Sequence, residues 1–174
     1  MIYYDFIPNS LVGDVLIAAS EKGLCAVIFG RRTKKGHVKK LMQMFATEPV
    51  ARRPAFMRPY RRELKDYFAG KLRKFTQPID LSAIHGPFQR KVLQRLARLP
   101  FGQLISYGEL AVRSGSPKAA RAVGSAMAAN PLPVVIPCHR VVESRGKLGG
   151  YSAGLSKKKK LLAHEGVLPE QLNL

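Results

Sequence analysis

Residues 107–142 read YGELAVRSGSPKAARAVGSAMAANPLPVVIPCHRVV, and they carry the strongest structural signals of the chain. Two helical segments are separated by a Ser-Gly-Ser-Pro turn at 114–117, and the second segment, from Lys118, consists mostly of alanine and other small residues. A short helix, a glycine-containing turn and a second helix form the outline of a helix-turn-helix unit. The small side chains allow the second helix to lie close to a partner surface, although close packing inside the same domain explains them equally well.

The same stretch ends in a cysteine next to a proline, a histidine and an arginine. Pro137 fixes its own φ and favours extended backbone at Ile136, so Cys138 is expected in a rigid turn and not inside a helix. Cysteine attacks as the thiolate, and a neighbour such as His139 can lower a thiol pKa that is otherwise about 8.5. An isolated Cys-His pair is more often structural, because free cysteine is among the most buried residue types. The remainder of the chain decides between these interpretations.

Short apolar runs dominate the first half of the chain. Three of them, at 2–7, 14–19 and 24–29, are rich in Ile, Val, Leu and aromatic residues and are separated by turn residues. They predict the strands of a small meander. A basic segment that follows Gly30, and residues 57–69 with apolar side chains at helical spacing, predict two helices.

The pattern becomes helical after a segment of mixed composition between Pro78 and Pro87. We therefore expect a domain boundary near residue 80. The predicted fold class is α+β: an α/β domain at 1–80 with a three-stranded sheet and helices, followed by a mostly helical, winged-helix-like helix-turn-helix domain at 81–174.

The chain is strongly basic over its whole length of 174 residues, with a formal net charge of +19. Residues 1–80 carry 16 Lys and Arg against 7 Asp and Glu, and residues 81–174 carry 14 against 4. Because the charge is not confined to a tail, the sequence predicts a polyanionic partner, and nucleic acid is the common one. No apolar run approaches the roughly 20 residues of a membrane span, and no amphipathic anchor is apparent, so no membrane partner is expected.

Cysteine and histidine usage indicates neither a disulfide framework nor a metal centre. The two cysteines, Cys25 and Cys138, are far apart and outside any Cys-x-x-Cys pair, and the start of the chain lacks a secretory signal pattern, so a reducing, cytoplasmic location is expected. The four histidines lack the spacing of a zinc site. We predict no metal and no cofactor.

Five motifs in the second half together resemble the O6-alkylguanine-DNA alkyltransferases, which repair DNA by direct reversal. They are Pro-Lys-Ala-Ala-Arg-Ala-Val-Gly at 117–124, Asn-Pro at 130–131, Ile-Pro-Cys-His-Arg-Val-Val at 136–142, Gly-Tyr-Ser at 150–152 and Leu-Leu-Ala-His-Glu-Gly at 161–166. Each motif is weak alone, but five in order with the expected gaps are specific. The resemblance covers roughly residues 86–166, and the first half matches only in general style.

The resemblance implies irreversible transfer of a methyl or other alkyl group from O6-alkylguanine, with O4-alkylthymine as a possible further substrate, to Cys138. It implies that His139 takes the thiol proton through a water and that Glu165 orients His139. It also implies that Tyr107 donates toward the departing purine and that Asn130 acts as a hinge. The thioether product resists hydrolysis, so the protein would act once.

The resemblance further implies that the helix-turn-helix enters the minor groove of double-stranded DNA and that the target nucleotide is flipped out. Arg121 would fill the gap in the base stack, although taken alone it is more simply a phosphate contact. The residues expected at the DNA surface are Ser116, Lys118, Ala119, Ala120, Arg121 and Gly124. The residues expected to form the substrate pocket are Met127, Val141, Gly149, Gly150, Tyr151 and Ser152. Gly150 and Ala153 depart from the usual family pattern, which leaves the accepted alkyl size open.

The helix that leads to Glu165 is expected to begin with Ser156 as its N-cap and then Lys157–Lys160. Four lysines at a helix N-terminus oppose the helix dipole, which suggests phosphate contact, while a solvated surface is an equal alternative.

Three other functions are compatible with parts of the sequence. A non-catalytic relative that only binds alkylated guanine would lack the acceptor cysteine, whereas Cys138 is present. A winged-helix regulator would not need Tyr107, His139 and Glu165 together. A thiol hydrolase would need an oxyanion hole, for which no separate signal exists. We therefore expect a monomeric alkyltransferase whose partner is duplex DNA containing O6-alkylguanine.

Overall fold

The computed structural model describes residues 1–30, 33–167 and 169–172. The chain divides into two compact units, Met1–Ala83 and Ile84–Leu174. The α+β fold class predicted from the sequence is confirmed: the first unit contains a sheet with helices, and the second is mainly helical. No helix in the described part of the chain is both long enough and apolar enough to cross a membrane.

The sheet of the first unit contains the three predicted strands and one more. The strands β1 (Ile2–Ser10), β2 (Gly13–Ser20) and β3 (Gly23–Ile28) form an antiparallel meander, and β4 (Val50–Arg52) pairs with β1 in parallel, which gives the order β3-β2-β1-β4. The expectation of three strands was therefore wrong by one. A three-residue strand is too short to produce an alternating pattern, and only its pairing with the edge of β1 defines it.

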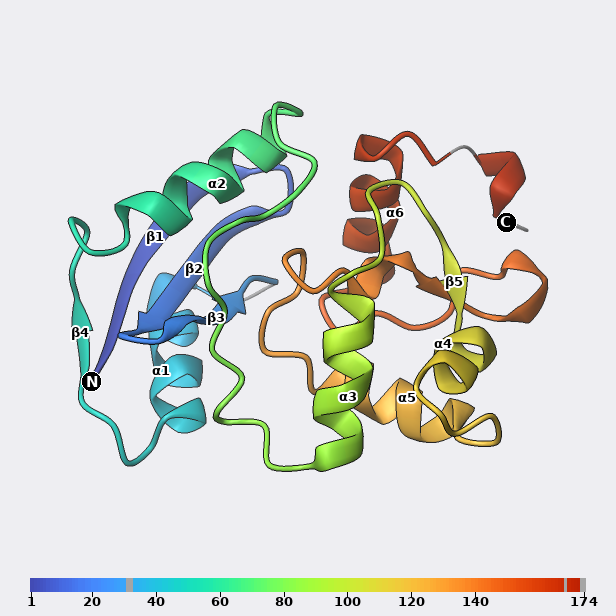
Figure 1. Ribbon diagram of the computed structural model, residues 1–174. Coiled ribbons are helices and arrows are strands. Elements are labelled where there is room, and N and C mark those ends of the chain that lie inside the picture. The colour runs from blue at the N-terminus through green and yellow to red at the C-terminus, as the bar shows by residue number, and fades with distance from the viewer. Residues whose placement is uncertain (31–32, 168, 173–174) are drawn as a thin grey trace. The chain divides into compact units, whose positions relative to one another are not determined.

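Two helices cover the sheet, α1 (Lys34–Met44) and α2 (Arg58–Phe68), as Figure 1 shows. Leu41 of α1 packs into a core cluster with residues of all three meander strands. On the side of α2, the buried Asp5 accepts hydrogen bonds from Arg52 and from Arg61 of α2. Because β2 and β3 are buried on both faces, their sequences are nearly continuous apolar runs and lack strict alternation. Residues 31 and 32 of the predicted basic helix lie outside the described residues.

Residues 78–80 belong to the first unit because they pair with the start of β3. The amide of Leu24 donates to the carbonyl of Pro78, and the amide of Asp80 donates to the carbonyl of Leu24, both at 2.8 Å. A Cβ atom on Gly23 would lie 2.5 Å from the Pro78 oxygen, so glycine is required for this close approach.

The second unit is built on three helices, α3 (Pro87–Leu96), α4 (Tyr107–Arg113) and α5 (Ala120–Ala128), which pack on one another. Helix α4 begins with a capping box, in which the Ser106 hydroxyl accepts from the Glu109 amide and the Glu109 carboxylate accepts from the Ser106 amide. The helix-turn-helix outline is therefore confirmed as α4, a turn and α5.

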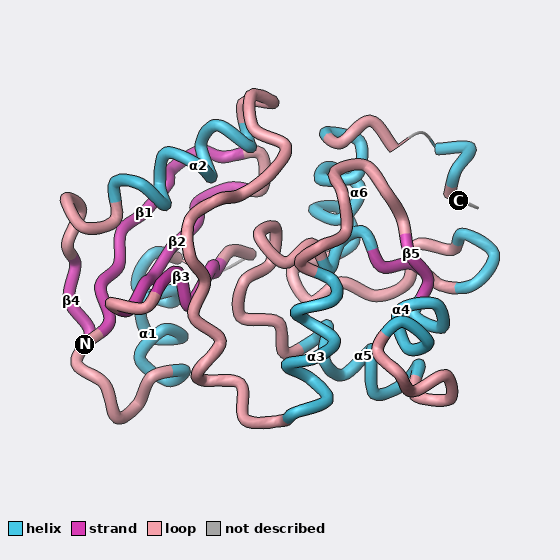
Figure 2. The backbone as a smooth tube through the Cα atoms, in the orientation of Figure 1, coloured by secondary structure: helices cyan, strands magenta, loops and turns pink. Residues whose placement is uncertain are grey.

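A small parallel pair of strands, β5 (Ile105–Ser106) and β6 (Val141–Val142), joins the entry to α4 with the segment after Cys138. Figure 2 shows that most of the chain between α5 and α6 (Leu155–His164) is loop. Short 3-10 turns occur at Cys138–Arg140, Ser144–Gly146 and Pro169–Gln171. The predicted reactive segment therefore lies on irregular backbone between α5 and α6.

Candidate active site

Cys138 lies at the start of a 3-10 turn and borders a pocket of about 320 Å³. The residue is only 5% exposed, so the pocket is its route to a ligand. The other residues that line the pocket are Tyr107, Gly124, Met127, Ala128, Gly150, Tyr151 and Ser152. Five of them were expected as substrate-pocket or catalytic residues, Gly124 was expected at the DNA surface, and Ala128 was not expected at all.

The turn before Cys138 is held by the side chain of Asn130. Its Nδ2 donates to the Ile136 carbonyl at 2.9 Å, and its Oδ1 accepts from the Leu132 amide at 3.0 Å. Within this turn Val134 has a φ of 80°, which is a strained conformation for a β-branched residue. Asn130 thus joins the end of α5 to the cysteine turn and stabilises its backbone.

Burial raises the pKa of the Cys138 thiol, and this effect outweighs four that lower it. Those four are a hydrogen bond with Asn130, the positive charge of Lys158, a hydrogen bond with Tyr151 and a hydrogen bond with the backbone of Cys138 itself. The expectation of a pKa lowered by the neighbouring residues was therefore wrong for this conformation. The thiol is protonated at neutral pH, and a base must remove its proton during the reaction.

His139 and Glu165 form a fully buried pair behind Cys138. The Nε2 atom of His139 lies 2.8 Å from Oε1 of Glu165. Burial lowers the pKa of His139, and the carboxylate of Glu165 only partly offsets this, so the imidazole is neutral at neutral pH. Within the described residues, the Nδ1 atom of His139 is buried without a hydrogen-bond partner. This nitrogen is available to accept a proton.

Arg140 completes the cluster, and the sequence analysis did not single it out. Its Nε donates to Oε2 of Glu165 at 2.7 Å and its Nη2 donates to Oε1 at 2.8 Å, while its Nη1 donates to the Leu99 carbonyl. Burial would raise the pKa of Glu165, but the hydrogen bonds from His139 and Arg140 hold it well below its usual range. Glu165 also accepts from the Gly102 amide at 3.1 Å. The sequence signal that could have pointed to Arg140 is its position directly after His139.

Lys158 is fully buried, which contradicts both readings of the lysine run as exposed or phosphate-bound at this position. Its Nζ donates to the carbonyls of Val141 at 2.7 Å, Leu148 at 2.5 Å and Gly150 at 3.2 Å. Burial lowers its pKa to about 8. Lys158 thus fastens α6 to the segment after the cysteine and to the pocket loop. The exposed Lys159 and Lys160 remain free to contact a phosphate.

Helix α6 begins at Leu155 with Gly154 at the N-cap, so the predicted N-cap at Ser156 was wrong. Gly154 has a φ of 100°, which other residues rarely adopt, and no side-chain cap is present. The glycine turn, and not a serine cap, sets the start of the helix.

The pocket loop passes close to Tyr107. A Cβ atom on Gly149 would lie 3.3 Å from Cε2 of Tyr107 and 3.3 Å from Cγ of Glu143, and the φ of Gly149 is 68°. Gly149 therefore lies beside the pocket without lining it. Burial raises the pKa of Tyr107, as do the nearby Cys138 and Glu143, so its hydroxyl keeps its proton.

One face of α5 connects the pocket to the outside. Gly124 and Ala128 line the pocket, and the exposed Arg121 precedes them by three and seven residues, on the same side of the helix. The remaining residues expected at the DNA surface lie around the start of α5: Ser116, Lys118, Ala119 and Ala120. A ligand bound at this helix would face both Arg121 and the pocket.

Val141 is fully buried and does not line the pocket, in contrast to the expectation from the sequence. Its carbonyl accepts the hydrogen bond from Lys158. Val141 therefore has a structural role, in which its backbone carbonyl binds Lys158.

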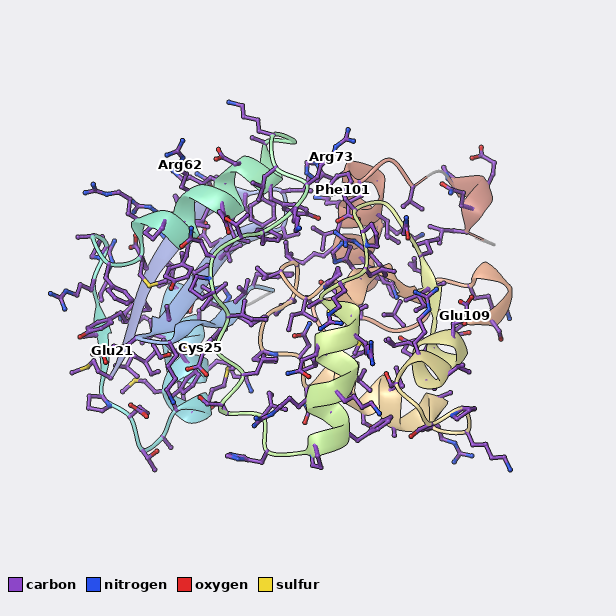
Figure 3. The ribbon with its side chains drawn as sticks, viewed as in Figure 1. Glu21, Cys25, Arg62, Arg73, Phe101 and Glu109 are labelled. Carbon is purple, nitrogen blue, oxygen red and sulfur yellow. The ribbon has the colours of Figure 1, made fainter. Side chains whose placement is uncertain are left out.

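The second cysteine lies in a different environment. Cys25 is buried in β3, among the strands in Figure 3, and burial raises its pKa to about 12. Over the described residues, no group of three or more His, Cys, Asp or Glu side chains is arranged to hold a metal ion.

Comparison with known proteins identifies the family. Residues 87–167 match the sequence profile described as "6-O-methylguanine DNA methyltransferase, DNA binding domain", and residues 2–81 match the "6-O-methylguanine DNA methyltransferase, ribonuclease-like domain". The chain belongs to the 6-O-methylguanine DNA methyltransferase family. All five motifs around the pocket fall within the region matched by the DNA-binding domain of that family.

Individual relatives agree with this family assignment. A methylated-DNA–protein-cysteine methyltransferase of Methanosarcina acetivorans is 39% identical over 94% of this chain and 98% of its own length. One of Salmonella typhimurium is 48% identical over 61% of each chain. Among solved structures, a Mycobacterium tuberculosis OGT in complex with DNA superposes with a TM-score of 0.79 at 32% identity and covers 97% of this chain and 96% of that one.

Proposed function

We propose that this protein repairs DNA by direct reversal, transferring a methyl or other alkyl group from O6 of guanine to the Sγ atom of Cys138. One observation supports the proposal above the others. Cys138 lines the pocket, and the next residue, His139, is paired with Glu165 through Nε2 while its Nδ1 has no hydrogen-bond partner within the described ranges. The names of the relatives describe the same reaction class.

The residues around the pocket match the proton movements that this reaction needs. Sγ attacks the alkyl carbon, a carbon–sulfur bond forms, and the bond between that carbon and O6 breaks. The thiol proton passes through a water to Nδ1 of His139, and the hydroxyl of Tyr107 supplies a proton to the departing guanine. Glu165 holds the imidazole in orientation and stabilises it when it becomes charged. Asn130 keeps the cysteine turn in place.

The transfer ends in a thioether, which water does not hydrolyse readily. Each molecule therefore acts once and is consumed, with no cofactor in the reaction. A non-catalytic binder of alkylated guanine is the alternative, and the presence of Cys138 beside His139 and Glu165 disfavours it.

Duplex DNA is the proposed partner, and the protein is proposed to act as a monomer. The similar mycobacterial OGT, whose structure was solved in complex with DNA, supports a DNA partner by analogy. A net charge of +19 favours binding to the phosphate backbone through counterion release. The small residues of α5 suit the minor groove, which is only about 6 Å wide. Arg121 would replace the flipped nucleotide in the stack, since it lies on the same helix face as the pocket. Such repair would take place on the nucleoid in the cytoplasm.

The pocket loop is proposed to close over the flipped base. Met127 and Tyr151 would form apolar walls of the pocket, and Ser152 with the backbone of Cys138 would contact the guanine edge. Gly150 leaves room at the mouth, because no atom lies within 4 Å of a Cβ placed there. This open side is where larger alkyl groups would extend.

The decisive test is the mass of the intact protein after incubation with a duplex that contains O6-methylguanine. We expect a gain of one methylene unit, located by peptide mapping on Cys138, and no gain in Cys138→Ser. Cys25 serves as an internal control, because it is buried in β3 with its Sγ donating to the Ala18 carbonyl and does not line the pocket. Binding of the duplex without any gain of mass would establish the non-catalytic alternative instead.

A further inference from the structure

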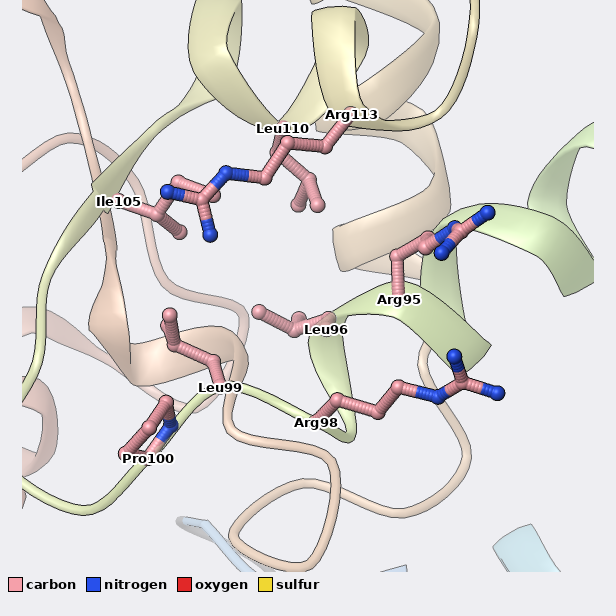
Figure 4. A pocket seen from close by; sticks show the side chains of 8 residues that line it. All are labelled: Arg95, Leu96, Arg98, Leu99, Pro100, Ile105, Leu110 and Arg113. Atoms are coloured by element: carbon pink, nitrogen blue, oxygen red, sulfur yellow. The ribbon is translucent and has the colours of Figure 1, made fainter.

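A second pocket lies in the second unit, between the end of α3, the loop that follows it, β5 and α4. Its volume is about 320 Å³, and Figure 4 shows the residues that line it: Arg95, Leu96, Arg98, Leu99, Pro100, Ile105, Leu110 and Arg113. It shares no lining residue with the pocket at Cys138. The proposed alkyl transfer therefore leaves this pocket without a role.

Three exposed arginines surround the pocket, Arg95, Arg98 and Arg113. Among the residues that the structure describes, none of the three forms an ion pair with a carboxylate. Glu109, whose charge is near enough to interact with Arg113, is engaged in the capping box with Ser106. Arg95 and Arg113 lie in the last turns of their helices, where a cation is favourable, but this explains neither the third arginine nor the pocket between them.

The wall of the pocket is apolar. Leu96, Leu99, Ile105 and Leu110 form it, and in Figure 4 Leu96 lies between Arg113 of α4 on one side and Arg95 and Arg98 on the other. The volume is at the small end of the range for ligand pockets, about 300 to 1,000 Å³. It suits one or two apolar side chains more than a large cofactor.

The combination of charge and apolar surface restricts the occupant. A DNA backbone would satisfy the arginines with phosphate, but a phosphate on these exposed arginines would not occupy the pocket between them. A fatty acid would fill the apolar space but carries a single carboxylate for three guanidinium groups. A peptide with several acidic side chains beside an apolar one satisfies both, because arginine binds carboxylates in a bidentate manner.

We propose that this pocket, defined by Arg95, Arg98 and Arg113 around Leu96, Leu99, Ile105 and Leu110, is a docking site for an acidic peptide segment of another protein. An apolar side chain of that segment enters the pocket, and flanking Asp or Glu side chains pair with the arginines. The contact recruits a partner protein to the repair protein through a surface separate from Cys138.

The test uses a fluorescent, C-terminally amidated peptide, Asp-Asp-Glu-Asp-Leu-Phe, and measures anisotropy with the 174-residue protein at about 0.15 M salt, where distant charges are screened. We expect saturable binding that weakens roughly tenfold in the double variant Arg95→Ala with Arg113→Ala. The matched control removes two exposed charges elsewhere, Lys159→Ala with Lys160→Ala, and should bind the peptide as the parent does. Thermal unfolding checks that both variants are folded.

Two further arms separate docking from simple charge attraction. A peptide with Leu-Phe replaced by Ser-Ser should bind at least about tenfold more weakly, and methyl NMR signals of Leu96, Ile105 and Leu110 should shift only with the apolar peptide. Equal binding of both peptides, or equal losses in the two double variants, would overturn the proposal. If an unmodified duplex displaces the peptide and the arginine variant loses the same factor in DNA affinity, the surface binds phosphate and the peptide assignment is wrong.

Discussion

The Nε2 atom of His139 lies 2.8 Å from Oε1 of Glu165, and both side chains are fully buried. The same carboxylate also accepts two hydrogen bonds from Arg140. A single carboxylate therefore orients the proposed base and neutralises a buried cation. Changes at Glu165 should affect stability as well as reaction rate.

Replacement of Glu165 by Gln should lower the free energy of unfolding by about 3 to 5 kcal/mol, because it leaves the Arg140 guanidinium buried without a counter-charge. Urea unfolding at pH 7 measures this loss. The exposed Glu170→Gln is the control and should change stability by less than about 0.5 kcal/mol. Adding Arg140→Met to Glu165→Gln should recover part of the loss; a double variant whose loss equals the sum of the single losses would contradict the coupling.

The interaction of Glu165 with His139 and Arg140 should also make the stability of the protein depend on pH in the acidic range. The pKa of Glu165 in the folded protein is below its usual value of 4.5, so its contribution to stability is complete above that value and is lost as the pH falls through the folded pKa. Between pH 5 and pH 3, the free energy of unfolding should fall less steeply in Glu165→Gln than in the parent. The free energy of unfolding is measured by denaturant titration at each pH. If it changes with pH equally in the two proteins, the pKa of Glu165 does not differ between the folded and unfolded states.

Lys158→Met should slow alkyl transfer and loosen the pocket loop. Methionine can occupy the buried space, but it cannot donate to the carbonyls of Val141, Leu148 and Gly150, which Lys158 now satisfies. Hydrogen exchange at the amides of residues 147–152 should become faster. Lys160→Met, on the exposed face of the same helix, is the control and should leave unchanged both the exchange and the transfer from free O6-benzylguanine, which makes no phosphate contact. Unaltered exchange in Lys158→Met would mean that the loop is held by other contacts.

Gly149→Ala should impair the protein more than Gly150→Ala. At position 149 the positive φ is strained for alanine, and a methyl group 3.3 Å from Tyr107 and Glu143 would force these side chains to shift, whereas a Cβ at Gly150 meets nothing within 4 Å. We expect a loss of about 1 to 3 kcal/mol in stability for Gly149→Ala, together with slower transfer through displacement of Tyr107. Thermal unfolding and transfer from free O6-benzylguanine measure the two effects. The opposite order of the two variants would contradict this account.

Arg121→Ala should slow transfer from duplex DNA much more than transfer from free O6-benzylguanine, because the free base needs no flipping. The two transfer rates are compared at a saturating protein concentration, so that weaker binding of the variant to DNA does not lower the rate. The control is the exposed Lys118→Ala, which should lower affinity and reduce the salt slope by about one ion, with the rate restored at saturation. Full recovery of the rate in Arg121→Ala at saturation would make Arg121 a phosphate contact instead.

The rate of alkyl transfer should depend on pH in the same way as ionisation of the Cys138 thiol. Because burial raises the pKa of Cys138, the rate of reaction with O6-benzylguanine should increase with pH through neutrality. In His139→Ala the rate should be lower at pH 7, and the difference should narrow as the pH rises, since hydroxide replaces the lost base. A rate that is flat from pH 6 to pH 9 in the parent would indicate a thiolate already formed at rest.

Much of the site follows from the sequence alone, because its signals are local. Pro137 before Cys138 dictates a turn, Ser106 with Glu109 forms a capping box, and the small residues of α5 create a face with little bulk. The apolar runs of β1, β2 and β3 predict strands, since short runs of β-branched and aromatic residues between turn residues favour them. These features depend on neighbours within a few positions.

The remainder depends on contacts between residues far apart in the chain, which only the tertiary structure decides. Strand β4 exists because β1 offers an edge to pair with. Lys158 is buried because carbonyls 8 to 17 residues away converge on it, although its sequence neighbours are exposed or half-buried lysines. Burial raises the pKa of the Cys138 thiol and outweighs the effects of its polar neighbours. This burial depends on the three-dimensional packing around the residue. The five motifs that resemble the alkyltransferases therefore indicated the reaction, while packing determined the protonation state from which it starts.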